Sequence, residues 1–252
     1  MELPADPQWA VPVRQPEAAP GHDEGLLLPV GPGGDEGRPL TVDLLRTGGL
    51  LVTGSPGSGR SSALTAFGQH VRALGAAVLR IGWPPRGLDP GEEIPGAVWL
   101  DGADEAGATE WLAGLGDRPG VVIADDVGAP PDAPALARIQ LRGLQGGVAL
   151  VAAANAGQLS AHYQGPIAAL RRARTGLLLC PGSGDADLLG IRLPRTPLPH
   201  RPGSGWLVTG ATLQRVQVAR RAMPAIPRPQ GPDDQSRSSA GPISWLAYQA
   251  SS

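Results

Sequence analysis

The sequence predicts an α/β domain in which a mainly parallel β-sheet is flanked by helices. Two observations lead to this prediction. First, short apolar runs alternate with segments whose apolar residues recur at helical spacing. Such alternation is typical of a parallel sheet, because parallel strands need a crossover connection that is usually a helix. Second, 252 residues, 41% of them hydrophobic, suffice for one such domain but not for two independent cores.

The predicted elements follow in order from residue 25. The apolar runs Gly25–Val30 and Pro39–Leu45, separated by the turn Gly31–Gly34, predict a β-hairpin. The remaining apolar runs predict buried strands at residues 49–53, 76–81, 97–100, 121–125, 148–153 and 175–179. Helical spacing predicts helices at residues 61–74, 105–115, 133–144 and 166–174. A short terminal β-hairpin, 205–209 with 216–219, ends the domain.

The two ends of the chain differ from its middle in composition. Residues 1–24 are Pro-rich and polar and predict a flexible arm, and residues 25–222 hold the predicted domain. Residues 223–252 are predicted to form a disordered tail, because Pro, Ser and Asp dominate most of it. The sequence leaves open whether the apolar cluster Trp245–Tyr248 docks on this domain, on a partner, or on neither.

Composition narrows the functional classes. Every basic residue is Arg, and the net charge of −2 argues against a general nucleic-acid-binding protein. The single cysteine, Cys180, excludes an internal disulfide and lies in an apolar run, as expected of a buried small hydrophobe. No stretch reaches the ~18–20 apolar residues of a membrane span. We therefore expect a cytoplasmic protein with no membrane span, either free or at the periphery of a membrane complex.

A glycine-rich loop between a predicted strand and a predicted helix carries the clearest functional signal. Residues Gly54–Ser61 match G-x-x-x-x-G-K-[ST] except that Arg60 replaces the Lys. Backbone N–H groups of such a loop and of the following helix N-terminus bind phosphate, and Ser61 would bind Mg²⁺. The predicted ATP-binding residues are Gly54, Ser55, Pro56, Gly57, Ser58, Gly59, Arg60, Ser61 and Ser62.

A second acidic motif supports this interpretation. The apolar run Val121–Ala124 would deliver Asp125 to the Mg²⁺ shell, as a Walker B strand does. We expect this strand to neighbour the strand before the loop, with the Asp125 carboxylate close to the Ser61 hydroxyl. Asp125 and Asp126 are the predicted catalytic residues, although Asp126 is one methylene shorter than the Glu common in motor ATPases. A guanidinium at Arg60 is also larger and differently aimed than an ammonium. Both departures predict impaired hydrolysis.

On these motifs the chain resembles the FtsK/SpoIIIE superfamily, and it looks most similar to degenerate C-terminal modules of EccC-type ATPases of type VII secretion. The resemblance covers roughly residues 25–220. Besides the loop it rests on Leu28–Gly31, Val42–Leu44, Gly48–Val52, Leu170–Leu179, Asp187–Arg195 and Gly203–Val208. It implies a RecA-like P-loop NTPase that binds ATP and Mg²⁺ at interfaces with sister ATPase domains or with copies of itself. Arg60 and Asp126 stand where the family has its Lys and catalytic Glu.

Three functions remain open from the sequence. The first is an ATP-binding module of a translocase with impaired or no hydrolysis. The second is a non-catalytic module that docks a secretion-substrate peptide, and the third is a DNA-translocating motor subunit. Arg171, Arg172 and Arg174 fit either a contact with a partner's phosphates or favourable charge at a helix C-terminus, and Arg195 is equally ambiguous. The histidines show no metal-ligand spacing.

Overall fold

A computed structural model of the chain describes residues 8–9, 25–82, 94–127, 134–143, 146–182, 184–195 and 198–221. All of these residues belong to one compact unit, Met1–Ala222. The predicted tail, its Trp245–Tyr248 cluster and most of the predicted arm lie outside the described residues. Within the arm, β1 (Gln8–Trp9) pairs in parallel with β12 (Arg220–Arg221).

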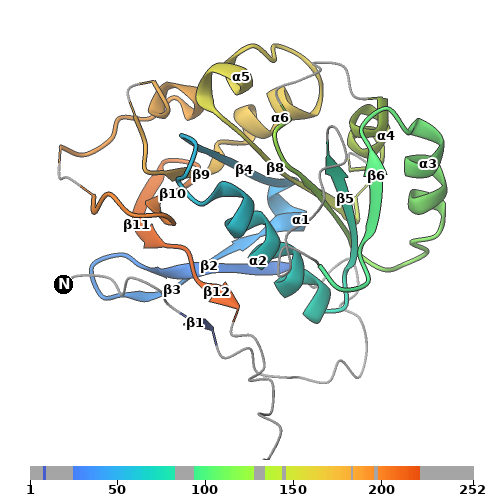
Figure 1. Cartoon of the computed structure of the whole chain (residues 1–252), viewed down its shortest axis with the longest axis horizontal. Coiled ribbons are helices and arrows are strands. Elements are labelled where there is room, and N and C mark those ends of the chain that lie inside the picture. The colour runs from blue at the N-terminus through green and yellow to red at the C-terminus, as the bar shows by residue number, and fades with distance from the viewer. Residues whose placement is uncertain are drawn as a thin grey trace, which may run out of the picture. The chain divides into compact units, whose positions relative to one another are not determined.

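Ten strands form the central sheet. In chain order they are β2 (Leu27–Gly33), β3 (Arg38–Asp43), β4 (Gly49–Gly54), β5 (Ala77–Gly82), β6 (Val98–Asp101), β7 (Gly120–Ala124), β8 (Val148–Ala154), β9 (Thr175–Leu179), β10 (Ser204–Thr209) and β11 (Thr212–Gln217). Across the sheet the order is β3-β2-β11-β10-β9-β4-β8-β7-β5-β6 (Figure 1). The six strands from β9 to β6 run parallel, and the other four are antiparallel to their neighbours. The prediction of a mainly parallel sheet is confirmed.

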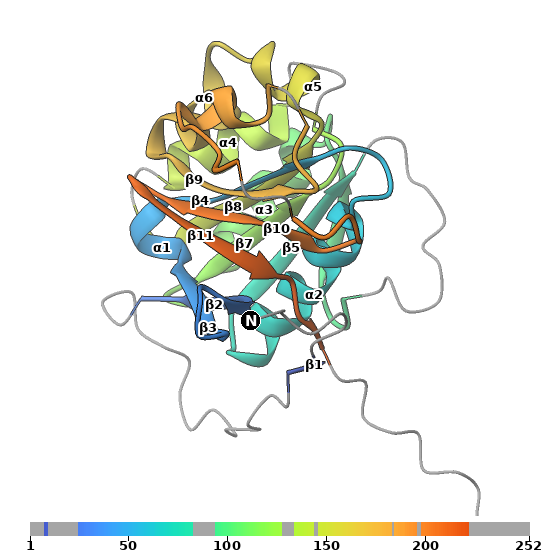
Figure 2. The same ribbon diagram turned by 90° about the vertical axis from the view of Figure 1, so that its left-hand side faces the viewer.

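Helices cover both faces of this sheet. The longer ones are α2 (Arg60–Ala73), α3 (Glu105–Ala113), α4 (Pro134–Gly143) and α6 (Gly165–Ala173), and the short ones are α1 (Leu44–Thr47), α5 (Ala156–Ser160) and the 3₁₀ helix η1 (Ala186–Leu189). In the side view α4, α5 and α6 lie on one side of the parallel strands and α2 lies on the other (Figure 2). The four predicted helices are thus all present, each within a few residues of its expected bounds.

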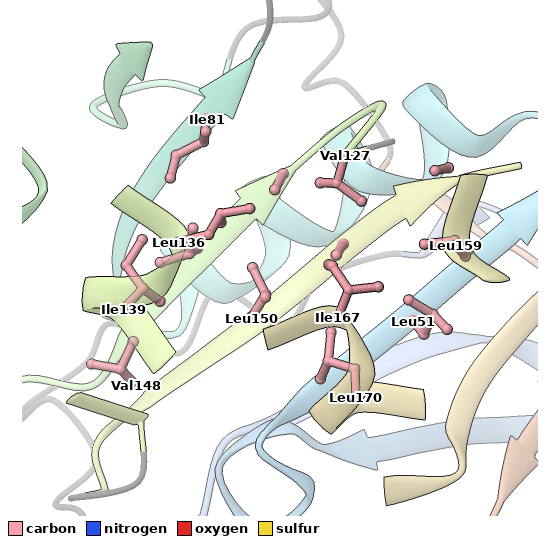
Figure 3. Packing of buried hydrophobic residues seen from close by; sticks show 14 of the residues in the cluster. Leu51, Ile81, Val127, Leu136, Ile139, Val148, Leu150, Leu159, Ile167 and Leu170 are labelled. Atoms are coloured by element: carbon pink, nitrogen blue, oxygen red, sulfur yellow. The ribbon is translucent and has the colours of Figure 1, made fainter. Parts of the chain in front are cut away.

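Each face of the sheet carries its own apolar core. Under α4 and α6, Ile139 and Ile167 pack toward Leu150 and Leu51 of the strands (Figure 3). Residues from the alternate positions of the same strands, such as Leu50 of β4, pack with α2 on the opposite face. A strand buried on both faces has no polar side to show, which explains why its sequence is a continuous apolar run.

Several short elements differ from the sequence-based expectation, which also lacked the helices α1 and η1. The short helix α5 was not predicted, because one turn is too brief to reveal helical spacing. Its capping box was a usable signal, since Asn155 Oδ1 accepts from Gln158 N–H and Gln158 Oε1 accepts from Asn155 N–H. The second strand of the terminal hairpin is Thr212–Gln217, not 216–219. The first four residues of this strand are exposed or partly buried and mostly polar. The apolar pattern in the sequence therefore indicated only the end of the strand.

Candidate functional site

The glycine-rich loop leaves the sheet at the carboxyl end of β4, in the middle of the parallel strands. All six residues of β4 are buried, so the loop begins on a fixed support. Gly57 and Gly59 have φ angles of 81° and 93°, a left-handed region in which other residues are strained. The turn is closed by a hydrogen bond from Ser58 N–H to Ser55 O at 3.1 Å. Both glycines are therefore required by the shape of the loop.

The helix that follows the loop presents an open N-terminus. Gly59 is the N-cap of α2, no side chain caps the helix, and its first turn holds no acidic residue. Ser61 and Ser62, in that turn, are exposed. The first N–H groups of a helix have no partner within it and carry partial positive charge. The start of α2 is thus suited to bind an anion, as the motif predicts.

Two buried polar atoms beside this helix N-terminus have no partner among the described residues. They are Ser58 Oγ, on a side chain that is 2% exposed, and Arg60 Nη1. A buried polar atom without a hydrogen bond costs roughly 1–3 kcal/mol. Such atoms are rare in folded proteins and call for an explanation, one of which is a polar ligand. Their position beside a glycine-rich loop that matches a phosphate-binding motif favours that explanation.

The acidic motif lies at the same edge of the sheet but farther from the loop than expected. Asp125 and Asp126, both half-buried, follow the last residue of β7. The prediction that β7 is the neighbour of β4 is wrong, because β8 lies between them. Chain order does not set strand order, and the later strand β8 inserts at the centre. Since all three strands are parallel, their carboxyl ends still meet at one edge.

The turn after β7 has a constrained backbone. Asp126 has a φ of 53°, an uncommon conformation for a residue other than glycine. Its N–H donates to Asp125 Oδ1 at 2.9 Å, so one oxygen of the predicted Mg²⁺ ligand is engaged within the turn. Val127 N–H donates to Ala153 O at 3.1 Å and ties the turn to β8. A contact between the Asp125 carboxylate and the Ser61 hydroxyl stays a prediction.

A turn from the C-terminal hairpin packs against the loop on the α2 side. Gly203 N–H donates to Ser58 O at 2.8 Å, and a Cβ placed on Gly59 would lie 3.0 Å from Gly203 N. Between this turn and the start of α2 lies a hollow of about 270 Å³, lined in part by Ser62, Ala63 and Pro202. Sequence analysis did not assign Arg201–Gly203 to the site.

A larger hollow, of about 750 Å³, lies on the other side of the loop. It is bordered by Gly54–Pro56 and also by Asn155, Arg195 and Trp206. Asp185, 6% exposed, lies at its edge and accepts hydrogen bonds from Thr53 Oγ1 at 3.2 Å and from Gly182 N–H at 2.6 Å. Asp185 therefore links the segment after β9 to the carboxyl end of β4, the strand that precedes the loop.

One sequence signal points to both of these unassigned segments. The tetrapeptide Pro-Gly-Ser-Gly occurs three times, at residues 56–59, 181–184 and 202–205. The first copy is the centre of the phosphate loop, and described residues of the second line the larger hollow. The third copy forms the turn against Ser58. All three copies therefore border the candidate site, although they lie far apart in the sequence.

The arginine cluster at the C-terminal end of α6 forms hydrogen bonds mainly within the chain. Arg171 Nη1 donates to three carbonyl oxygens around the end of α5, the nearest being that of His162 at 2.9 Å. Arg174 Nε donates to Leu189 O at 3.0 Å at the end of η1. These two guanidinium groups cap helix ends, although Arg174 is exposed, as Arg172 is. A partner contact from this cluster is thus best placed at Arg172.

The single cysteine does not have the environment of a nucleophile. Burial raises the pKa of the Cys180 thiol, and a hydrogen bond from Sγ to Arg201 O, 3.1 Å long, only partly opposes that effect. A raised pKa keeps the thiol protonated, and the thiolate is the reactive form. Cys180 is nevertheless only half-buried and lines the larger hollow, so it is less buried than the sequence predicted.

Magnesium is the one metal the site is expected to take. Ser61 and Asp125 would supply a hydroxyl and a carboxylate, and Mg²⁺ usually completes its shell with phosphate oxygens and water. In the described part of the chain, no cluster of three or more His, Cys, Asp or Glu side chains could hold a metal ion by itself. The residues present therefore fit a metal that arrives with a nucleotide.

Comparisons with known proteins show the fold. No protein-family model and no curated protein matches the chain. Among solved structures, the cytoplasmic domain of EssC has a TM-score of 0.66 and 17% identity over 88% of this chain and 48% of its own. EssC (ATPases 2 and 3) from Geobacillus thermodenitrificans has a TM-score of 0.65 and 16% identity, with 87% and 45% covered. Thermomonospora curvata EccC (ATPases 2 and 3) in complex with a signal sequence peptide has a TM-score of 0.62 and 19% identity, with 88% and 44% covered.

The chain has the RecA-like fold of these ATPase domains. The resemblance to EccC-type ATPases that the sequence suggested is thereby confirmed at the level of the fold. The chain spans less than half the length of each of these three structures. No helix among the described residues is long and apolar enough to cross a membrane.

Proposed function

We propose that this RecA-like domain is an ATP-binding module of an FtsK/SpoIIIE-type translocase, similar to those of type VII secretion, with impaired or no hydrolysis of its own. One observation carries the proposal: the uncapped start of α2 lies beside two buried polar atoms without partners, on Ser58 and Arg60. An anion at this position would satisfy both the helix N-terminus and these atoms.

Different residues around the loop would bind different parts of the nucleotide. Apart from that of Ser58, which donates to Ser55 O, the backbone N–H groups from Gly57 to Ser62 would face the phosphates, and Ser61 and Asp125 would hold Mg²⁺. The bound ion neutralises phosphate charge when present. The smaller hollow, between α2 and Arg201–Gly203, would receive the ribose and base. Its volume of about 270 Å³ suits a part of a ligand rather than a whole one, since complete small-molecule sites span roughly 300–1,000 Å³.

Impaired hydrolysis follows from the same residues. Arg60 carries its charge on a planar fork, so it does not reproduce the point charge of a Lys ammonium between phosphate oxygens. Asp126 is shorter than Glu, and its left-handed backbone is fixed by the bond to Asp125. Removing one well-placed electrostatic group from an active site costs ~10²–10³ in rate. Binding depends mainly on backbone N–H groups and is retained.

The partners proposed for this module are sister ATPase domains or further copies of the chain. The EssC and EccC structures that share its fold contain more than one ATPase. Arg172 and Arg195 are exposed, and Arg195 borders the larger hollow next to the loop. An exposed Arg near such an interface could reach a neighbour's phosphates. The net charge of −2 does not support the DNA-translocation hypothesis, because DNA binding depends on basic residues that contact phosphates.

A second candidate function is docking of a secretion-substrate peptide. The larger hollow favours it, because about 750 Å³ bordered by Leu193, Leu198 and Trp206 offers room for apolar side chains. One solved structure of the same fold, EccC from Thermomonospora curvata, is in complex with a signal sequence peptide. A peptide in this hollow would also contact Gly54–Pro56 of the loop.

Nucleotide titration tests the proposal. The affinity of the full chain for ATP and ADP is measured by calorimetry with and without Mg²⁺, and phosphate release is followed in parallel. We expect binding that Mg²⁺ strengthens and release near background. Ser61→Ala should remove most of the Mg²⁺ dependence, with Ser160→Ala, an exposed serine distant in sequence, as the matched control. Absence of nucleotide binding would refute the proposal and favour the peptide-docking alternative.

A further inference from the structure

One buried side chain, Gln217, holds the turn that packs against the phosphate loop. Gln217 is the last residue of β11 and is 2% exposed. Its Oε1 accepts a hydrogen bond from Arg201 Nε at 3.0 Å, and its Nε2 donates to Pro202 O at 3.0 Å. Both ends of the amide therefore bind the same turn. A buried amide with partners at both ends fixes the position of what it binds.

Two glycines approach Gln217 closely, one at its side-chain amide and one at its backbone carbonyl. A Cβ on Gly203 would lie 2.8 Å from Gln217 Nε2, and a Cβ on Gly31 would overlap the Gln217 carbonyl oxygen. Glycines on both sides thus allow the backbone to approach Gln217 closely. The Arg201–Ser204 turn is thus held to the end of β11 by both ends of the Gln217 amide.

The turn passes this position on to the nucleotide site. Gly203 N–H donates to Ser58 O at 2.8 Å, and Val218 N–H donates to Gly203 O at 2.8 Å. Gly203 is thereby bonded to the phosphate loop through one backbone group and to the residue after Gln217 through the other. Arg201, Pro202 and Gln217 itself line the smaller hollow beside α2.

We infer that Gln217 is a positioning residue for the ribose and base of the bound nucleotide. It acts through the Arg201–Gly203 wall and does not need to touch the phosphates. The inference rests on the proposed function, because it assigns the smaller hollow to the nucleoside part of the ligand. A wall fixed before binding spares the cost of ordering it when the ligand arrives, which raises affinity.

Comparison of two ligands separates this role from general stabilisation. The probes are ATP and inorganic tripolyphosphate, which lacks the nucleoside, and the variants are Gln217→Met and Gln217→Glu in the full chain. Met keeps the length of the side chain and loses both hydrogen bonds. Glu keeps the acceptor for Arg201 and loses the donor to Pro202 O. The control is Val208→Ala, because Val208 is a buried apolar residue in the same hairpin and cannot form side-chain hydrogen bonds to the turn.

We expect Gln217→Met to weaken ATP binding about tenfold, the size of one or two net hydrogen bonds. Tripolyphosphate affinity should stay within about twofold, and Gln217→Glu should fall between wild type and Gln217→Met. Val208→Ala should lower the melting temperature and leave the ratio of the two affinities unchanged.

Four other outcomes overturn the inference in distinguishable ways. Equal losses for ATP and tripolyphosphate in both Gln217 variants would mean a structural role only. Unchanged ATP affinity in both variants, or equal affinity of the unmodified chain for the two ligands, would mean that the hollow does not receive the nucleoside. If the unmodified chain bound the two ligands equally well, the proposed phosphate site itself would still be supported. Failure of the unmodified chain to bind either ligand would refute the proposed function as well.

Discussion

The glycine-rich loop Gly54–Ser61 and the acidic turn Asp125–Asp126 both follow parallel strands. The two segments are held in different ways. The glycine-rich loop is supported from distant parts of the chain: Gly203 bonds to Ser58, and Asp185 bonds to Thr53 below the loop. Among the described residues, the acidic turn is tied to β8 by one backbone bond, and a second bond runs from Asp126 N–H to Asp125 Oδ1 within the turn itself.

This difference separates binding from turnover. The loop is preformed to receive an anion, because its N–H groups and its two partnerless polar atoms are already in place. In the acidic turn, by contrast, one Asp125 carboxylate oxygen accepts a hydrogen bond from the backbone of Asp126, and Asp126 has a left-handed conformation. A site of this kind is expected to retain nucleotide without fast hydrolysis.

The largest effect is expected from restoring the two residues that differ from active motors. Arg60→Lys removes a guanidinium nitrogen that has no partner among the described residues, and Asp126→Glu lengthens the acidic side chain by one methylene. Together they should raise phosphate release by at least ~10²–10³-fold over the unmodified chain. Release is measured at saturating Mg-ATP and at protein concentrations that allow copies or sister domains to associate. ATP affinity should change little.

Brisk hydrolysis by the unmodified chain would contradict the contrast, because the acidic turn would then be competent as it stands. The single variants serve as controls. If Arg60→Lys alone gave the whole gain, the defect would lie in the loop and the acidic turn would be adequate.

The next effect concerns the support of the loop. Gly59→Ala places a methyl group 3.0 Å from Gly203 N in a left-handed backbone, whereas Gly57→Ala has a similar φ but open space around it. A left-handed non-glycine residue costs about 1–2 kcal/mol, so both variants pay for backbone strain. Only Gly59→Ala also displaces the Gly203 turn.

We therefore expect Gly59→Ala to weaken ATP binding about tenfold more than Gly57→Ala does, about 1.4 kcal/mol. Calorimetry on both variants measures the difference, and circular dichroism confirms that each is folded. Equal losses would show that the turn from the C-terminal hairpin does not support the loop.

The sequence could predict the parts of this site that are continuous in the chain. The strand, the glycine spacing and the helix start all lie within Gly49–Ala73, and local physics links them: a buried strand, left-handed glycines and free N–H groups. The same holds for the acid that follows β7. Both motifs lie where a short-range pattern places them.

What the sequence could not supply was the arrangement across the sheet. The insertion of β8 between β4 and β7 depends on which strands pair, and pairing leaves no trace in a local apolar run. The walls from Asp185 and Gly203 lie more than a hundred residues from the loop they contact. Their recurring Pro-Gly-Ser-Gly signature marks tight turns, but no spacing rule says that these turns meet.

A smaller effect is expected at the buried link below the loop. Asp185→Asn keeps the shape of the side chain, but its amide group cannot accept from both Thr53 Oγ1 and Gly182 N–H. Leaving one buried partner unsatisfied should cost about 1–3 kcal/mol of unfolding free energy. Urea denaturation measures this cost. Thr53→Val, which removes the donor on the other side, should show a similar loss, and the double variant should lose less than the sum because the two residues interact. Strict additivity would contradict the link.

The smallest effect distinguishes two arginines on the same helix. Arg171 binds carbonyl oxygens at the end of α5, so Arg171→Met should cost about 1–2 kcal/mol of stability. Arg172 is exposed, and Arg172→Met should change the free energy of unfolding by less than about 0.5 kcal/mol. Urea denaturation of both variants measures this difference. If Arg172 instead meets a neighbour's nucleotide, Arg172→Met should reduce the turnover gained by the Arg60→Lys, Asp126→Glu chain while leaving its stability intact. An unchanged rate would place any trans-acting Arg elsewhere, with the exposed Arg195 at the larger hollow the next residue to replace.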